Sequence, residues 1–307
     1  MRIVAAQELA KLAPYRDIVE ALREGFRSEI TTPVRHHHKL PGNSILLLMP
    51  AWSGDFTGLK TVVVKPDNPA KGLPTITASY LLIDNATGAT VAIMDGTELT
   101  RRRTAAASAL ACDYLARPDA STLVIVGAGA LAPHFARAHA SVRPIKTVLV
   151  HSRTQAKSAK VVEELRSDGF DARVANDLED AVRKGDIITC VTTSSVPILK
   201  GAWLRPGTHV DLAGAFTPTM RETDGEVMSR SRVYVDTRDG ALAEAGDLLQ
   251  ARDEGKFDFA KVQGDLFELC RGSAACRKTP DEITLFKSCG TAIEDLAAAI
   301  LVFRRMS

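Results

Sequence analysis

The chain has 307 residues and a formal net charge of +2, and 45% of its residues are hydrophobic and 25% charged. This is the composition of an ordinary globular protein, long enough for two domains. The small net charge gives no electrostatic basis for binding nucleic acid or an anionic membrane surface, and no apolar run approaches the length of a membrane span. The N-terminal segment carries early acids and lacks the apolar core of a signal peptide, so we expect a cytoplasmic protein.

The cysteines and histidines give no sign of a disulfide framework or a metal site. The cysteines are scattered without C-x-x-C spacing at Cys112, Cys190, Cys270, Cys276 and Cys289, which favours reduced thiols. The run His36–His38 lies in a segment that is typical of a strand. Successive strand side chains point to opposite faces, so three adjacent histidines cannot chelate one ion, and we expect no metal.

The N-terminal third predicts one helix followed by a meander of strands. Apolar residues recur at helical spacing over 15–26, so we expect an amphipathic helix to open the protein. From Pro33 the chain breaks into short segments separated by turn residues, the pattern of an antiparallel meander. These segments span 34–40, 44–52, 56–64, 75–84 and 89–96. Asn85, Thr87 and Gly88 form the bend of the clearest hairpin, and an Ala-rich helix is expected over 100–116.

The stretch 123–140, LVIVGAGALAPHFARAHA, predicts a buried strand, a tight turn and a helix. Gly127, Gly129 and Ala132 match a G-x-G-x-x-G/A fingerprint. Gly127 permits the sharp turn, Gly129 lets a pyrophosphate approach the backbone, and Ala132 allows helix and strand to pack closely. The helix N-terminus then binds the phosphates. We therefore expect cofactor contacts along the whole loop: Gly127, Ala128, Gly129, Ala130, Leu131 and Ala132.

Beyond this loop, strands and helices alternate. Strands are expected over 147–151, 172–175, 186–191, 208–212 and 232–235, with helices over 155–167 and 178–183. This alternation predicts a Rossmann-type, doubly wound parallel sheet. The stretch 284–303 is expected to begin as a loop (LFKSCG) and to continue as an apolar helix that packs on the first domain. The prediction is an α/β protein: a discontinuous α+β domain with a mainly antiparallel sheet (1–116 with 291–307) and a Rossmann domain (117–290).

The residues after the second Rossmann strand favour NADPH over NADH. An NAD-selective site has an Asp or Glu at this point, whereas this chain has Ser152, Arg153 and Thr154. An arginine flanked by two hydroxyls suits a 2′-phosphate; the alternative is a solvated loop, which leaves NADH open. Thr192, Thr193 and Ser194 end another strand at the edge where nucleotides bind, so we expect cofactor contacts there too, with strand capping as the alternative.

Four further segments resemble the ornithine cyclodeaminase/μ-crystallin family. They are PVR (33–35), GLK (58–60) followed by KGLPTI, LTRRRTAAASALA (99–111) and LFKSCGTAIEDLAAA from Leu285, and GAGALA (127–132) lies between them. The resemblance implies a homodimer whose first domain supplies the interface and the substrate groups, while the Rossmann domain supplies the nicotinamide. It also implies that Arg35, Lys60 and Arg103 surround the substrate, with Thr75 beside them.

These residue types suit a 2-carboxylate substrate with a C=N group. Two arginines can hold the carboxylate in one plane, and a lysine can position and protonate the nitrogen. The structural alternatives are a helix cap for Arg103 and an exposed strand position for Lys60. Asp295, in the last helix, is expected either to face this site or to be a surface charge.

One departure from the family pattern bears on the reaction. The family's cyclodeaminases carry an acid in the loop that corresponds to GAFTPTMRE (214–222), where this chain has Phe216. An aromatic side chain cannot accept a proton or pair with an ammonium. We therefore favour the reductase branch, in which a cyclic imino acid, Δ1-pyrroline-2-carboxylate or Δ1-piperideine-2-carboxylate, is reduced to L-proline or L-pipecolate. The alternatives are ornithine cyclodeaminase, an amino-acid dehydrogenase such as alanine dehydrogenase, and a μ-crystallin-like NADPH-dependent binding protein.

Overall fold

The computed structural model describes residues 1–306, apart from the side chain of Pro69. The chain divides into two compact units: Met1–Thr104 with Thr291–Ser307 (unit 1) and Ala105–Gly290 (unit 2). The first junction falls inside helix α3 (Gly96–Leu115), which begins before the predicted Thr100 and belongs to both units. The sequence places this junction at the end of that helix, after residue 116.

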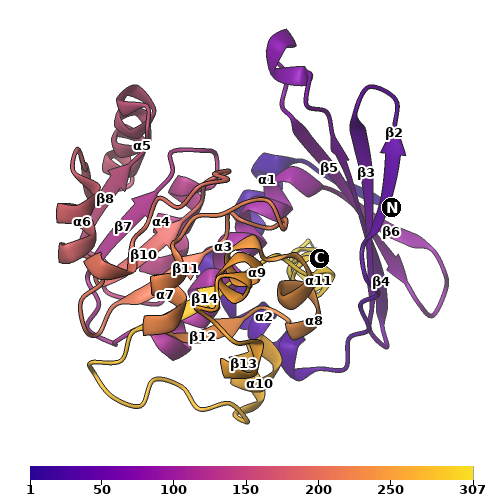
Figure 1. Ribbon diagram of the computed structural model, residues 1–307. Coiled ribbons are helices and arrows are strands. Elements are labelled where there is room, and N and C mark those ends of the chain that lie inside the picture. The colour runs from indigo at the N-terminus through magenta and orange to yellow at the C-terminus, as the bar shows by residue number, and fades with distance from the viewer. Residues whose placement is uncertain (307) are drawn as a thin grey trace. The chain divides into compact units, whose positions relative to one another are not determined.

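Unit 1 is built on a six-stranded sheet of order β1-β6-β5-β4-β3-β2 (Figure 1). The strands are β1 (Arg2–Val4), β2 (His36–Leu40), β3 (Ser44–Trp52), β4 (Phe56–Val64), β5 (Ile76–Asp84) and β6 (Thr90–Asp95). Strands β2 to β6 pair antiparallel in chain order, so the predicted meander is confirmed. β1 adds to the edge of the sheet in parallel with β6.

The helices of unit 1 are α1 (Ala6–Leu12), α2 (Tyr15–Arg27) and α11 (Ala292–Arg304), with a 3-10 turn, η1 (Asn68–Lys71), between β4 and β5. α2 buries Ile18, Val19, Leu22 and Phe26, as their spacing predicts. The expectation that α2 opens the protein is wrong, because β1 and α1 precede it; both are too short to give a periodic pattern. α11 packs against α2, β3 and β4.

The two faces of this sheet differ. Strand register places Met49, Lys60, Tyr80 and Met94 in one row across four strands, and each is at most 5% exposed. α11 packs on this face, as the hydrogen bond from Lys60 to Asp295 of α11 shows. Leu59, Leu81 and Ile93 pair across the opposite face and are only partly buried.

Unit 2 is an eight-stranded, all-parallel sheet of order β13-β12-β14-β11-β10-β7-β8-β9. The strands are β7 (Thr122–Val126), β8 (Thr147–His151), β9 (Asp171–Val174), β10 (Ile187–Cys190), β11 (His209–Leu212), β12 (Arg232–Val235), β13 (Val262–Asp265) and β14 (Thr284–Lys287). The helices are α4 (Ala132–Ala140), α5 (Gln155–Ser167), α6 (Leu178–Lys184), α7 (Gly225–Arg230), α8 (Arg238–Glu244), α9 (Gly246–Asp253) and α10 (Leu266–Arg271), with 3-10 turns η2 (Gly201–Trp203) and η3 (Phe259–Lys261). The predicted Rossmann-type sheet is confirmed.

The chain order of the strands reverses beside β7: β8 and β9 lie on one side, and β10 and β11 on the other. In an open parallel sheet, ligands bind in the crevice at such a switch point, outside the carboxyl ends of the strands. The loop after β7 carries Gly127, and the loop after β10 carries Thr192. The topology therefore places the Gly127 loop and the Thr192 loop, two of the predicted cofactor segments, at the same edge of the sheet.

One element of unit 2 differs from its prediction. Thr284–Lys287, expected to be the start of a loop, is β14, which lies between β11 and β12 with all four residues buried. A four-residue segment that ends in a lysine lacks the signal of a buried strand, since lysine is seldom fully buried. The sequence also gives no prediction for β13 and for α7 to α10, because each of these elements is too short to show a clear periodic pattern.

Candidate cofactor and substrate sites

The turn between β7 and α4 has the geometry of a phosphate-binding loop. Gly127 has a φ of 119°, and a Cβ there would lie 2.8 Å from the carbonyl oxygen of Val191, so only glycine fits. A Cβ on Gly129 would meet no atom within 4 Å, which leaves room above the backbone. No side chain caps the N-terminus of α4. Its first N–H, that of Ala132, donates to the carbonyl of Gly129 at 3.1 Å, and Pro133 has no N–H. The positive dipole end of the helix nevertheless favours an anion at this turn.

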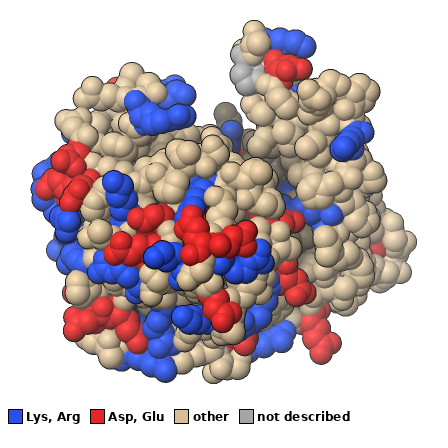
Figure 2. Space-filling model, viewed as in Figure 1, with Lys and Arg blue, Asp and Glu red and all other residues tan. Residues whose placement is uncertain are grey.

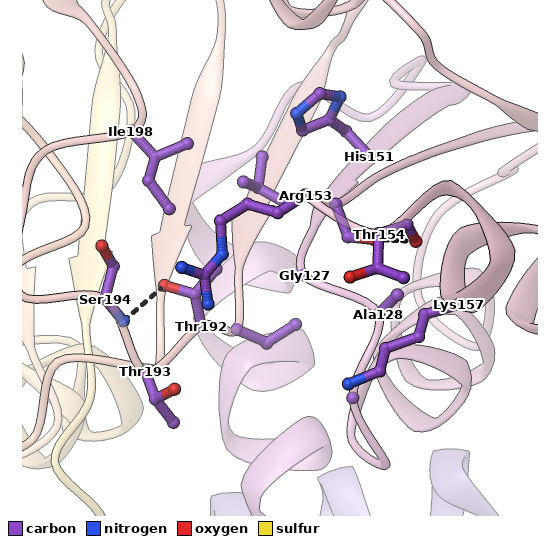
Figure 3. A pocket seen from close by; sticks show the side chains of 14 residues that line it. Gly127, Ala128, His151, Arg153, Thr154, Lys157, Thr192, Thr193, Ser194 and Ile198 are labelled. Carbon is purple, nitrogen blue, oxygen red and sulfur yellow. Dashed lines mark hydrogen bonds between the residues drawn. The ribbon is translucent and has the colours of Figure 1, made fainter.

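The loops after β7, β8 and β10 enclose a cavity of about 270 Å³ (Figure 3). Its lining includes nine of the residues that the sequence predicts as cofactor contacts: Gly127, Ala128, Gly129, Ser152, Arg153, Thr154, Thr192, Thr193 and Ser194. Ala130, Leu131 and Ala132 do not line it. Ala132 is instead fully buried in the core with Leu123 and Ile125, which is the close helix–strand packing expected of the third small residue.

The cavity lining is basic. Arg153 and Lys157 both line it and both are exposed, and the described lining contains no Asp or Glu. In the view of Figure 3 the Arg153 guanidinium points toward Thr192, away from Thr154 and Lys157. Lys157 was not predicted. A lining with two cations and no acid suits a phosphate group.

A buried charge cluster lies in unit 1, where β4, α3 and α11 meet. Lys60 Nζ is 2.9 Å from Asp295 Oδ1 and 2.7 Å from Oδ2. Arg103 donates from Nε to Asp295 Oδ1 at 2.9 Å and from Nη1 to Glu294 Oε2 at 2.5 Å. All four residues are at most 5% exposed. The structural alternatives are therefore wrong: Lys60 is no exposed strand residue, Arg103 is no simple helix cap and Asp295 is no surface charge.

The electrostatics of this cluster follow from burial and charge balance. Two cations face two carboxylates, as buried charges require. Burial and the neighbouring Arg103 lower the pKa of Lys60 to about 8, although Asp295 opposes them. For Arg103, burial alone would lower the pKa, but Asp295 and Glu294 outweigh it and raise the pKa. Lys60 is thus the titratable member and Arg103 the permanent cation.

The other two predicted substrate residues lie at different distances from Lys60. Arg35 directly precedes β2, whose first residue, His36, pairs with Leu48, next to the Lys60 partner Met49. Arg35 thus lies near the same end of the sheet, two strands and about 10 Å from Lys60. The register shifts by one residue before β2, where Thr31 pairs with Trp52, so the pairing does not assign Arg35 to a face. Thr75 directly precedes β5, five residues from Tyr80, the partner of Lys60. That is about 17 Å along the strand, so the structure does not bring Thr75 to the cluster.

Of the two acids in this cluster, Asp295 was a candidate from the sequence and Glu294 was missed. Both interrupt an otherwise apolar helix, TAIEDLAAAILVF. An apolar run predicts a buried helix, and a buried carboxylate needs a cationic partner. The sequence thus signals two buried acids but not which cations they bind.

Other predicted features are placed as follows. The rings of His36 and His38 share a face of β2, with centroids 6.4 Å apart, while His37 points to the other face. The part of the chain that the structure describes holds no group of three His, Cys, Asp or Glu residues arranged for a metal ion. Within it, no helix is both long and apolar enough to span a bilayer. On the face seen in Figure 2, acidic and basic side chains are interspersed.

The parallel sheet, its switch point and the Gly127 turn define a Rossmann-type dinucleotide-binding protein. Unit 1 of the same chain holds a buried lysine–arginine–carboxylate cluster. The family model described as "Ornithine cyclodeaminase/mu-crystallin family" matches residues 2–307, and the chain belongs to this family.

Similar proteins cover nearly the whole chain. A Delta(1)-pyrroline-2-carboxylate reductase of Paracoccus denitrificans is 40% identical over 300 residues, which are 95% of this chain and 93% of that protein. The solved structure of Thermococcus litoralis Delta(1)-pyrroline-2-carboxylate reductase in complex with NADH and L-proline has a TM-score of 0.94 at 34% identity, covering 99% of this chain and 97% of that chain. An archaeal alanine dehydrogenase dimer with bound NAD has a TM-score of 0.92 at 31% identity, covering 99% and 95%.

Proposed function

We propose that the protein reduces a cyclic ketimine 2-carboxylate, Δ1-pyrroline-2-carboxylate or Δ1-piperideine-2-carboxylate, to L-proline or L-pipecolate, with NADPH as the preferred reductant. The observation that carries this proposal is the buried cluster of Lys60, Arg103 and Asp295 in a chain with a dinucleotide-binding loop. The similarity to two pyrroline-2-carboxylate reductases supports the same reaction.

The cofactor, when bound, supplies a hydride to the imine carbon. Gly127 and Gly129 let its pyrophosphate approach the first turn of α4. Arg153 and Lys157 hold the 2′-phosphate of NADPH, which NADH lacks. The absence of an acid among the described residues that line the cavity removes the usual partner of an NAD ribose.

On the substrate side, the guanidinium of Arg103 holds the 2-carboxylate, and Arg35, two strands from Lys60, is its second cationic partner. Lys60 donates a proton to the imine nitrogen. Hydride addition to carbon and protonation of nitrogen together convert C=N to CH–NH, so atoms and charge balance.

The depressed pKa of Lys60 makes it a suitable acid. An ammonium whose pKa is near the working pH releases its proton more readily than one at the ordinary value, and burial lowers this pKa to about 8. Asp295 keeps the ammonium oriented, at 2.7 Å from its second oxygen.

Phe216 supports reduction over cyclodeamination. It lies in the loop after β11 and is 40% exposed. It replaces the acid that the cyclodeaminase mechanism needs, and an aromatic ring cannot take over proton transfer.

The uncovered sheet face of unit 1 supports a homodimer. Leu59, Leu81 and Ile93 lie side by side on the face opposite α11, and Ile3, which pairs with Ile93 at the edge, is 75% exposed. An exposed apolar surface of this kind marks an interaction site, and a symmetric dimer buries the same patch on both subunits. The similar alanine dehydrogenase is a dimer.

The five cysteines support a reducing compartment such as the cytoplasm. None of the five forms a disulfide, and Cys112, Cys190 and Cys270 are buried. Disulfides are rare in such compartments.

The test is cofactor oxidation at 340 nm with purified protein. Δ1-Pyrroline-2-carboxylate is supplied with NADPH and then with NADH, beside L-ornithine with NAD and pyruvate with ammonia and NADH. Rapid oxidation on the imine alone supports the proposal. Turnover of ornithine, or of pyruvate with ammonia, would replace it with the corresponding alternative, and tight NADPH binding without turnover would indicate a binding protein.

A further inference from the structure

Glu222 is a buried carboxylate outside both sites, and it binds the backbone of two loops at once. It is 0% exposed. Its Oε1 accepts the N–H of Thr192 at 2.7 Å, and its Oε2 accepts the N–H groups of Gly214 and Ala215 at 2.8 and 3.2 Å. Thr192 belongs to the turn after β10 that lines the cofactor cavity, and Gly214 to the loop after β11.

The backbone around Glu222 holds the rest of that cavity wall. The carbonyl oxygen of Glu222 accepts the N–H of Ile198 at 2.8 Å, and the N–H of Arg221 donates to the carbonyl of Ser194 at 2.8 Å. Ile198 and Ser194 both line the cavity. Segment 221–222 is thus bonded to the wall at Thr192, Ser194 and Ile198.

This arrangement is tightly packed. A Cβ on Gly214 would lie 2.1 Å from the carbonyl oxygen of Thr192 and 2.3 Å from Glu222 Oε1. Only glycine lets the two loops approach each other around the carboxylate. Asp247 anchors the other end of the segment, since its Oδ1 accepts the N–H groups of Glu222 and Thr223 at 2.8 and 2.9 Å.

We propose that Glu222 is a positioning residue for the nicotinamide cofactor: its ionised carboxylate fixes the turn after β10 against the loop after β11, so that cofactor affinity depends on the charge of this buried group. The inference rests on the proposed cofactor role of the cavity. The charge matters because three N–H groups donate to this one side chain. An ionised carboxylate can accept all three hydrogen bonds. A protonated carboxyl group or an amide points a hydrogen of its own at one of the donors, so one hydrogen bond is lost.

The surroundings of Glu222 allow this charge to change near neutrality. The facing groups are Lys287 on β14, Asp247 on α9 and Cys190 on β10. Lys287 Nζ is 3.6 Å from Asp247 Oδ2, and its charge also acts on Glu222. Burial raises the pKa of Glu222 to about 7, with Lys287 opposing and Asp247 reinforcing the rise. Protonation at lower pH therefore removes an acceptor, and cofactor affinity falls as pH falls through about 7.

The experiment measures the NADH dissociation constant by fluorescence between pH 6 and pH 8, for the wild type and for E222Q. NADH is the probe because it lacks the 2′-phosphate, a group that itself titrates near pH 6. We expect wild-type affinity to rise about 5- to 10-fold from pH 6 to pH 8. E222Q should bind roughly 10-fold more weakly at pH 8 and show no pH dependence. The kcat at saturating cofactor should change less than twofold.

Asp186→Asn is the matched control. Asp186 is also a buried carboxylate that accepts two backbone N–H groups, from Ser121 and Thr122 at 2.9 and 3.0 Å. It does so at the amino ends of the strands, away from the cofactor edge. D186N should lower the melting temperature and leave the NADH dissociation constant and its pH dependence unchanged.

A pH dependence that persists in E222Q would overturn the proposal and assign the titration to another group. If E222Q does not fold, H151Q decides, because His151 lines the same cavity: the proposal requires its NADH affinity to keep the wild-type pH dependence, and a flat profile overturns it. A pH-independent NADH affinity in the wild type also overturns it. Failure of the wild type to bind NADH would overturn the cofactor assignment itself, which is a separate and recognisable result.

Discussion

Removal of Arg153 and Lys157 tests the cofactor preference most directly. Both side chains line the cofactor cavity, and both are exposed. In the proposed function they bind the 2′-phosphate of NADPH, and NADH carries a hydroxyl in place of this phosphate. Arg153→Ala and Lys157→Ala should therefore weaken NADPH and leave NADH almost unchanged.

The size of the effect follows from the exposure of these side chains. A hydrogen bond to a charged group contributes about 1.5–3 kcal/mol when it is protected from water, and solvent reduces such a contact toward about 1 kcal/mol. A range of about 1 to 2 kcal/mol for each residue corresponds to about a 5- to 30-fold loss of NADPH affinity. Arg153 should stand at the upper end, because a guanidinium binds phosphate with two parallel donors.

The assay compares kcat/KM for NADPH and NADH in the wild type, in R153A and in K157A. Lys160→Ala is the control, since Lys160 is an exposed lysine of the same helix outside the cavity lining. K160A should leave the ratio unchanged. Raised salt should weaken NADPH more than NADH in the wild type, because it screens exposed charges. Equal losses for both cofactors in R153A would refute the phosphate assignment.

Three further predictions concern unit 1. Arg103→Ala should lower kcat/KM for the imine by at least about 10²-fold with NADPH affinity intact, and unchanged steady-state kinetics would remove Arg103 from the site. With protonated Lys60 as the proposed donor, kcat should fall as pH rises through about 8. Asp295→Asn removes a charge that raises this pKa, so the alkaline limb should move below 8, at a cost of about 3–5 kcal/mol in stability; a limb that stays in place in D295N would exclude Lys60 as its origin. Leu81→Glu, on the uncovered sheet face, should yield a monomer in analytical ultracentrifugation, and a dimer that persists would place the interface elsewhere.

Much of the fold could be predicted from local patterns alone. β8 and α5 have the bounds that the sequence predicts, 147–151 and 155–167, because alternation of polar and apolar residues and turn residues are local signals. The failures are short or charged elements. β14 lies in the middle of the parallel sheet, and its buried Lys287 is stabilised by Asp247, a partner that no local pattern reveals.

The cofactor loop was predictable for the same reason. The glycine spacing, the strand before it and the helix after it are contiguous, so residues 123–140 predict their own geometry, and Arg153 follows directly after β8. Lys157 was not predicted, since its contribution depends on the direction in which α5 leaves the cavity.

The buried charge cluster of unit 1 shows what the tertiary structure alone decides. The sequence by itself determined the residue types: a lysine on a strand, an arginine early in a helix, and two acids in an apolar helix. It did not determine that Asp295 lies between Lys60 and Arg103, because the bonded residues are 235 and 192 positions apart in the chain. Only the packing of α11 on β4 brings these charges together, and their burial then lowers the pKa of Lys60. Local propensity specifies elements, whereas burial and charge pairing depend on contacts that form only when distant segments fold together.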